Sequence, residues 1–445
     1  MKSMTSGNPG RLILAFALPM LIGSFVQIFY TLSDSYIVSR TLGVSSYAAV
    51  GSTAVLIAII YGFNRGLVNG FCIVCAQRFG AGDIKGTAKS FVHSFSLCMI
   101  AGLAISAVLL PAARIILAAV HTPEEIADDA FCYLATLIGF VSLTMASDAL
   151  SSMLLAVGDS KSPLAFQLAS SIVNVVLDCL FIMAFHMGVF GAAIATVISQ
   201  VISGSLCALK IFSKYPELLP EKGGWRLESG ECLVHLKLGA SMAFQQSIIW
   251  IGNIFVQSSV NAMGTVVIAA VAMAQRIREI NMSPIFCVAA AASVFTAQNN
   301  GANLPERIIS GIKHSVLIVL AASVFMAFFN LLMGRGITEV LLEGNPEAAG
   351  LAYTYLLYVG FTLILLGFML VFRSMLQGLK KTAAPTICSV METAMSLACA
   401  LYFVPAFGFI GVCLANPLSW LVSGIPIYIA SCRHISKISR KRKAR

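Results

Sequence analysis

The sequence alternates between long apolar runs and short segments that hold most of its glycine, proline and charged residues. Runs of about 20 apolar residues can cross a bilayer as helices, and the ten-residue alternation typical of a membrane barrel is not seen. The pattern therefore predicts an all-α polytopic membrane protein. The twelve expected helices are 11–36, 47–77, 89–119, 129–157, 162–185, 189–213, 233–262, 265–297, 309–333, 350–377, 382–404 and 407–432.

The chain carries an internal repeat. The sequence AQRFGA, residues 76–81, ends the second predicted helix, and AQNNGA, residues 297–302, ends the eighth, 221 positions later. Gly191 in the sixth helix similarly corresponds to Gly411 in the twelfth. Since each copy has an even number of helices, both begin on the same side, which predicts two six-helix lobes related by a pseudo-two-fold axis along the membrane normal. The expected organisation is an N-lobe at 1–213, a linker at 214–232, a C-lobe at 233–432 and a basic tail at 433–445.

Composition and charge agree with a membrane protein. The chain is 58% hydrophobic and only 11% charged, with a net charge of +10. The basic residues fall in alternate loops, as the positive-inside rule requires, and this explains the charge better than nucleic-acid binding does. We expect a multi-pass, monomeric protein of a prokaryotic plasma membrane, in contact with lipid and not with nucleic acid, with both termini cytoplasmic.

The first apolar run contains a polar stripe. Gln27, Tyr30 and Asp34 recur at spacings that place them on one face of a helix. An ionised carboxylate within a bilayer is costly, so this face is expected to line a protein cavity. Pro19, earlier in the same helix, removes a backbone hydrogen bond and predicts a bend.

A second polar group lies in the fifth and sixth predicted helices. Asn174 and Asp178 are four residues apart, and both Asp178 and Thr196 lie about two turns below the outer surface, as Asp34 does in the outer half of its helix. Two carboxylates in one poorly hydrated chamber either share a proton or require a cation, and hard oxygen ligands suit Na⁺. Either Asp alone is better explained as a local hydrogen-bonding group, whereas the set at matched depth favours an H⁺ or Na⁺ site.

Three other intramembrane acids are less distinctive. Asp148 either lines the cavity as a proton stepping stone or bonds to neighbouring Ser and Thr hydroxyls. Glu279 has Arg276 three residues earlier, which favours a local ion pair. Glu392 has no partner on its own helix, so it is expected to contact either a cationic substrate or a neighbouring helix.

The sequence shows no motif for a metal site, a disulfide framework or an enzyme active site. The twelve cysteines are scattered through apolar runs as small hydrophobic residues, and Cys72 with Cys75 lacks the second pair that a zinc site requires. We expect no disulfide and no cofactor. No Gly-x-Ser-x-Gly elbow or comparable catalytic motif appears, so a membrane enzyme is not favoured. Twin lobes also favour alternation over an open channel.

These features together resemble the MATE family of multidrug and toxic compound extrusion transporters, and most closely its DinF-type branch. The likeness covers essentially the whole chain and depends on the order of LPMLIGSFVQIFYTLSDSYIVSRTLG, AAVG, AQRFGAGD, GDSKSPL with NVVLDCLF, AQNNGA and NPLSW. The resemblance implies an ion site at Asp34, Asn174, Asp178 and Thr196, with Gln27 and Tyr30 in its polar network and Pro19 at a bend.

The sequence also departs from the family pattern. Where one branch has a Glu in the seventh helix, this chain has Gln245 and Gln246, which together with Asp148 and Glu392 we assign to the polar cavity. The family's Arg-Ile-Glu-Ser run appears as residues 276–279, Arg-Ile-Arg-Glu. The resemblance implies a secondary antiporter that exports small organic cations or amphipathic drugs in exchange for H⁺ or Na⁺. The alternative is a lipid-linked oligosaccharide flippase of the same superfamily.

Overall fold

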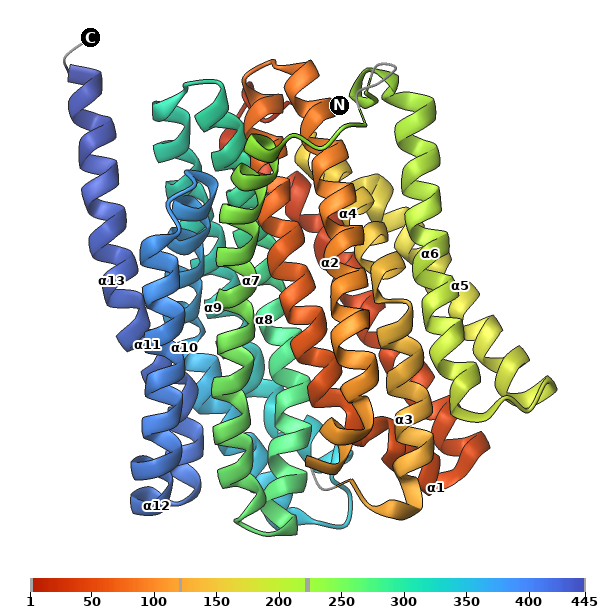
Figure 1. Cartoon of the computed structure of the whole chain (residues 1–445). Coiled ribbons are helices and arrows are strands. Elements are labelled where there is room, and N and C mark those ends of the chain that lie inside the picture. Colours follow the sequence, from red (N-terminus) through yellow and green to blue (C-terminus); the bar gives the residue numbers. More distant parts are fainter. Residues whose placement is uncertain (1–2, 120–121, 221–224, 444–445) are drawn as a thin grey trace. The chain divides into compact units, whose positions relative to one another are not determined.

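The computed structural model describes residues 3–119, 122–220 and 225–443, which form helices and contain no strand (Figure 1). The α-helices are α1 (Pro9–Gly80), α2 (Ile84–Ala119), α3 (Glu124–Gly139), α4 (Val141–Ala156), α5 (Lys161–Asp178), α6 (Gly188–Lys214), α7 (Ser229–Asn261), α8 (Thr265–Gly301), α9 (Pro305–Leu341), α10 (Pro346–Gly378), α11 (Ala383–Ala398), α12 (Val404–Phe407) and α13 (Phe409–Lys443). Single π-helical turns, Cys179–Ala184 and Cys399–Phe403, continue α5 and α11, and a short 3₁₀ turn spans Pro216–Leu218.

The helices correspond in order to the twelve that the hydrophobic pattern predicts. α1 contains two spans, Pro9–Gly43 and Ser45–Gly80, which meet where Gly43 has a φ of +86°, a conformation that glycine adopts without strain. α3 and α4 form one span bent by 48°. Within the described residues ten helices are long and apolar enough to cross a membrane, or eleven with the α3–α4 pair. α7 is the remaining segment; it is long, but polar residues such as Gln245 and Gln257 lower its hydropathy.

The chain forms two compact units whose boundaries differ from the predicted lobes. The first unit consists mainly of Ile22–Ala243, and the second of Met4–Leu21 with Phe244–Arg445. The start of α1 therefore belongs to the second unit, and the start of α7 to the first. The predicted linker, 214–232, also ends earlier than expected, because α7 already begins at Ser229. Residues 221–224 of this linker, and 444–445 of the predicted tail, lie outside the described residues.

Small residues hold the first part of α7 in the first unit. A Cβ atom added to Gly70 would lie 2.5 Å from Cα of Gly239, and one added to Gly66 would lie 2.5 Å from Cα of Ala243. Gly66 and Gly70 form a G-x-x-x-G pair on α1, which lets two helix backbones approach closely. The sequence pattern of α1 thus explains why this half of α7 packs here.

Charged side chains reinforce the same association. Arg78 Nη2, near the end of α1, lies 2.6 Å from Glu231 Oε2, and Lys89 Nζ lies 2.7 Å from Glu228. The backbone N–H of Glu228 donates to His93 Nε2 at 3.0 Å. These contacts join the predicted linker to α1 and α2 within the first unit.

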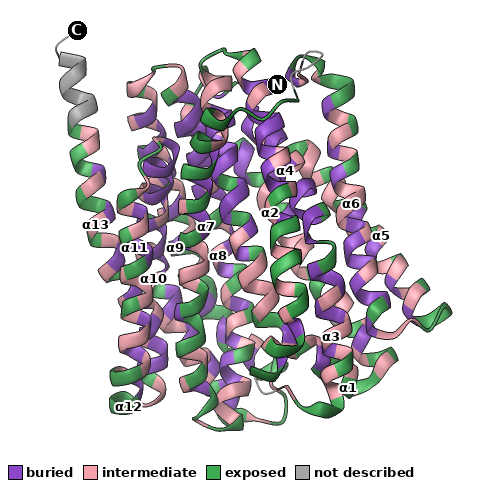
Figure 2. Cartoon of the chain, viewed as in Figure 1, coloured by how far each residue is buried: buried purple, intermediate pink, exposed green. Residues whose placement is uncertain are grey.

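The second unit holds the first residues of the chain in a similar way. Gln298 accepts a hydrogen bond from the backbone N–H of Met4 at 2.8 Å, and Arg307 donates to the carbonyl oxygens of Met4 and Gly7. α8 and α10 pack against each other in this unit. Both helices are largely buried: 67% of an apolar 18-residue stretch of α8 and 56% of such a stretch of α10 lie inside the protein (Figure 2).

Candidate functional site

The structure brings Asp34 of α1 and Asp178 of α5 together inside the first unit. Asp178 is fully buried, and its carboxyl group interacts electrostatically with that of Asp34. Asp34 Oδ1 and both oxygens of Asp178 are buried and have no hydrogen-bond partner among the described residues. Two ionised carboxylates that face each other repel, so this arrangement favours a state in which one of them is protonated or a cation lies between them.

Asn174 lies one helical turn before Asp178 and adds two more unpaired polar atoms. Its side chain is fully buried, and neither its Oδ1 nor its Nδ2 has a hydrogen-bond partner among the described residues. Directly after Asp178, α5 changes to a π-helical turn at Cys179–Ala184, a feature frequent at functional sites. Buried polar atoms without partners are costly, so this cluster is poised for a proton or cation.

Thr196 of α6 and Tyr30 of α1 form the next contact. Tyr30 Oη lies 3.2 Å from Thr196 Oγ1, and the Thr196 hydroxyl donates to the carbonyl oxygen of Ala192 at 3.1 Å. Because the threonine hydrogen is used in this bond, the Tyr30 hydroxyl is the donor to Thr196. Tyr133 of α3, which sequence reasoning missed, interacts electrostatically with Asp34 and Asp178. It is an ordinary aromatic in an apolar run, so no local signal singled it out.

Gln27 and Pro19 lie elsewhere on α1. Gln27 Oε1 accepts from Gln167 Nε2 of α5 at 2.8 Å, so it pairs with an amide and not with the carboxyl groups. Pro19 is buried, and the backbone of the span Pro9–Gly43 is assigned as helical through it. The division between the two units falls between Leu21 and Ile22, just after this proline. A hinge at Pro19 stays a prediction.

Asp148 of α4 forms a separate contact. Its Oδ2 accepts from Asn64 Nδ2 of α1 at 2.5 Å, and Arg65 is its electrostatic neighbour. The partner is therefore an amide on another helix, not the neighbouring Ser and Thr hydroxyls that the sequence suggested. Tyr61 interacts electrostatically with both Tyr30 and Asp148 and so lies between the two groups.

The second unit favours the neighbouring-helix alternative for Glu392. Its Oε2 lies 3.9 Å from Arg373 Nη1 of α10, and the two side chains are only 12% and 6% exposed. Arg373 Nη2 also donates to Ser389 Oγ at 2.8 Å and Gln245 Oε1 at 3.2 Å. Glu392 is thus paired internally rather than free to meet a cationic substrate. The arginine could have been found in the sequence by screening the apolar runs for bases as well as acids.

Of the other predicted polar residues, Gln245 contacts this cluster around Arg373, whereas Arg276 and Glu279 form a separate pair on α8. Gln245 is fully buried and also accepts from Gln377 Nε2 at 3.0 Å, while Gln246 is half-buried. Arg276 and Glu279 lie 3.9 Å apart, which confirms the predicted local ion pair on α8. All twelve cysteines are free in the described residues.

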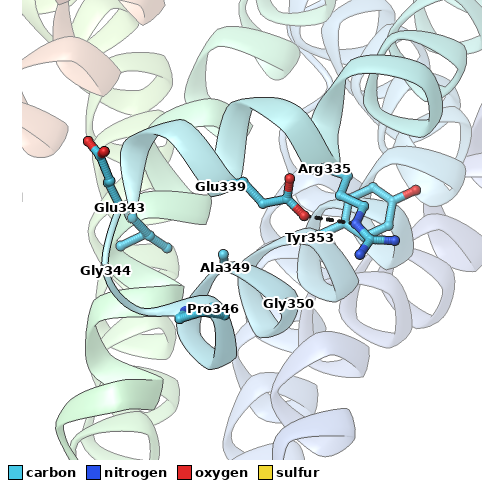
Figure 3. A pocket seen from close by; sticks show the side chains of 9 residues that line it. Arg335, Glu339, Glu343, Gly344, Pro346, Ala349, Gly350 and Tyr353 are labelled. Carbon is cyan, nitrogen blue, oxygen red and sulfur yellow. Dashed lines mark hydrogen bonds and ion pairs between the residues drawn. The ribbon is translucent and has the colours of Figure 1, made fainter.

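A surface pocket of about 460 Å³ lies at the turn between α9 and α10 (Figure 3). Arg335 and Glu339 line it from α9 and form an exposed ion pair of 2.9 Å, and Tyr353 lines it from α10. None of the predicted site residues belongs to this lining, so we place the candidate site at the buried carboxyl pair.

A bundle of bilayer-length helices in two repeated units, with a buried acidic pair inside one of them, defines a polytopic membrane transporter rather than an enzyme. The MatE family model matches the chain twice, at residues 19–180 and 241–402, and the chain belongs to this family. The double match agrees with the internal repeat.

Individual relatives support the assignment. The probable multidrug resistance protein YpnP of Bacillus subtilis is 29% identical over 309 residues, 68% of each chain. DNA damage-inducible protein F of Escherichia coli is 29% identical over 188 residues, 41% of this chain and 40% of its own, in agreement with the DinF-type resemblance. A solved outward-facing structure of a multidrug resistance MATE transporter of the MOP superfamily matches with a TM-score of 0.90 and 25% identity over 98% of both chains.

Proposed function

We propose that this protein is a secondary active antiporter that exports small organic compounds in exchange for H⁺ or Na⁺, by alternating access between its two lobes. Multidrug resistance relatives support the export of organic compounds. The observation that carries the coupling is the electrostatic interaction between Asp34 and Asp178, since Asp34 Oδ1 and both Asp178 oxygens are buried without a hydrogen-bond partner among the described residues.

The coupling follows from the charge state of this pair. When a proton is bound, the two carboxyl groups form a hydrogen bond and carry one negative charge. When it leaves, two negative charges face each other, which costs about 4 kcal/mol for charges about 4 Å apart at an effective dielectric of about 20. Na⁺ would relieve the same repulsion, with Asn174 Oδ1 as a further hard oxygen ligand.

Export requires that ion and substrate bind the two access states with different affinities. Loading of the pair would draw α1 and α5 together, and Pro19 would let the outer part of α1 bend. The cargo proposed from the acidic pair is a cationic or amphipathic compound. The flippase alternative gains support from intramembrane arginines such as Arg373, but that side chain is paired with Glu392.

The transport experiment uses ethidium efflux from proteoliposomes, with proton and sodium gradients imposed separately. We expect one gradient to drive efflux in the wild-type protein and Asp34→Asn and Asp178→Asn to abolish it. Asp128→Asn is the matched control, because that carboxylate is 88% exposed on α3 and pairs with Arg114. Wild-type efflux from either of the first two variants would refute the proposed ion site.

A further inference from the structure

The altered run at residues 276–279 places a second base, Arg278, inside the apolar helix α8. Its Nη1 donates to Tyr355 Oη of α10 at 3.1 Å. Asn416 Nδ2 of α13 donates to the same oxygen at 3.0 Å. Tyr355 is 2% exposed, so the guanidinium reaches into the interior of the second unit.

Within the described residues, no carboxylate forms an ion pair with Arg278. Among the ion pairs of residues 3–119, 122–220 and 225–443, none includes Arg278. Glu279, its neighbour, lies 3.9 Å from Arg276 on the exposed side of α8. Arg278 lies about 20 Å along α8 from Thr265, and an uncompensated cation at such a depth is expensive. Arg373 differs, because Glu392 accompanies it.

Two unpaired atoms of opposite kind lie on this face of α8. Nε of Arg278 is a buried donor without a partner, and Oδ1 of Asn281 is a buried acceptor without a partner, within the described part of the chain. The residues are three apart, so their side chains share a face. Asn281 Nδ2 is held by Asn330 Oδ1 at 2.9 Å, which fixes the free oxygen in place.

The internal repeat shows that the two units differ in where they carry buried charge. Asn416 follows Thr196 by 220 positions, the same interval that separates Gly191 from Gly411. Each of these two side chains contacts a tyrosine hydroxyl, Tyr355 and Tyr30 respectively. Phe255 follows Asp34 by the 221 positions that separate the early helices of the two copies, and Ala398 follows Asp178 by 220. The second unit therefore replaces the acidic pair with apolar residues and adds a guanidinium.

We propose that Arg278, Asn281, Tyr355 and Asn416 form a binding site for the anionic group of a small organic compound that also carries a hydroxyl or N–H donor. A phosphate, carboxylate or sulfonate accepts from the guanidinium, and the donor of the ligand bonds to Asn281 Oδ1. The cargo thus includes organic anions and zwitterions. The binding site itself does not depend on the proposed function. Only the statement that the bound compound is exported rests on it.

The test measures binding to purified protein in nanodiscs, without any ion gradient, by flavin fluorescence anisotropy. Flavin mononucleotide and riboflavin share a ring and hydroxyl chain and differ in one phosphate. We expect the mononucleotide to bind at least about tenfold more tightly. Arg278→Gln should weaken its binding roughly 10- to 100-fold, the range of charge-assisted hydrogen bonds, and leave riboflavin unchanged.

Arg276→Gln is the matched control, because it removes an exposed arginine two residues earlier and should keep the wild-type preference. Tyr355→Phe removes only the hydroxyl that holds Nη1 and should also weaken mononucleotide binding, which provides a test if Arg278→Gln does not fold. Equal affinity for the two flavins, no saturable mononucleotide binding, or an unchanged preference in folded Arg278→Gln or Tyr355→Phe would overturn the proposal.

The two proposals fail separately. Asp34→Asn should keep the preference for the mononucleotide over riboflavin even though it no longer exports ethidium. A protein without ion-driven efflux but with an Arg278-dependent phosphate preference would refute the antiport and keep this site.

Discussion

Gly70 of α1 offers a sharp test of how the first half of α7 is held in the first unit. In Gly70→Ala the new methyl carbon would lie 2.5 Å from Cα of Gly239 and 2.9 Å from the carbonyl carbon of Leu238. Carbon atoms in contact prefer about 3.5–4.0 Å. The obstructing atoms are backbone, so the two helices must separate by about 1 Å.

Separation also loosens the packing that surrounds the contact. Phe71 of α1, which is 1% exposed, lies against Gly239, and Ala243 belongs to the same core cluster. Overpacking of this kind costs about 1–3 kcal/mol. If the whole cost lowers the unfolding barrier, the rate of thermal inactivation rises by about 5- to 150-fold.

The assay is the loss of monodisperse protein at a fixed temperature, followed by fluorescence-detected size exclusion. Gly51→Ala is the matched control. Gly51 also lies in α1, but a methyl group added there has no neighbour within 4 Å outside the backbone of its own helix. If Gly70→Ala and Gly51→Ala proteins are lost at the same rate, close backbone packing does not hold α7 in this unit.

Two further predictions concern charged groups. Arg373→Leu should destabilise the protein by about 3–5 kcal/mol, because it leaves buried Glu392 without its cation, and Arg373→Leu combined with Glu392→Leu should recover most of that loss in thermal unfolding. Asp159 lies in the loop between α4 and α5; burial acts to raise its pKa, but hydrogen bonds from Ser162 and Tyr215 outweigh it and lower the pKa below 3.8. A carboxyl group whose pKa is lower in the folded state stabilises that state at pH values above its unfolded-state pKa, and this stabilisation is lost as the pH falls. The loss of thermal stability in Asp159→Asn should therefore be present at pH 7 and shrink below about pH 4. A loss of stability that does not depend on pH would contradict this.

The sequence alone determined the class of protein and most of its candidate ion site. Twelve apolar runs predict the helices because each run is a local property, set by side chains that need no partner to be apolar. The sequence also predicted that Asp34 and Asp178 lie at a similar depth, because depth follows from position along a helix, and the helix face on which each residue lies follows from helical spacing.

Only the tertiary structure decided which polar groups meet. Three contacts between different helices show this: Asp34 with Asp178, Glu392 with Arg373, and Arg278 with Tyr355. The same holds for the unit boundaries within α1 and α7, which depend on close backbone packing at Gly66 and Gly70. Spacing along one helix fixes the face on which a side chain lies, but the neighbour on that face comes from another helix, and its charge and size are set by packing.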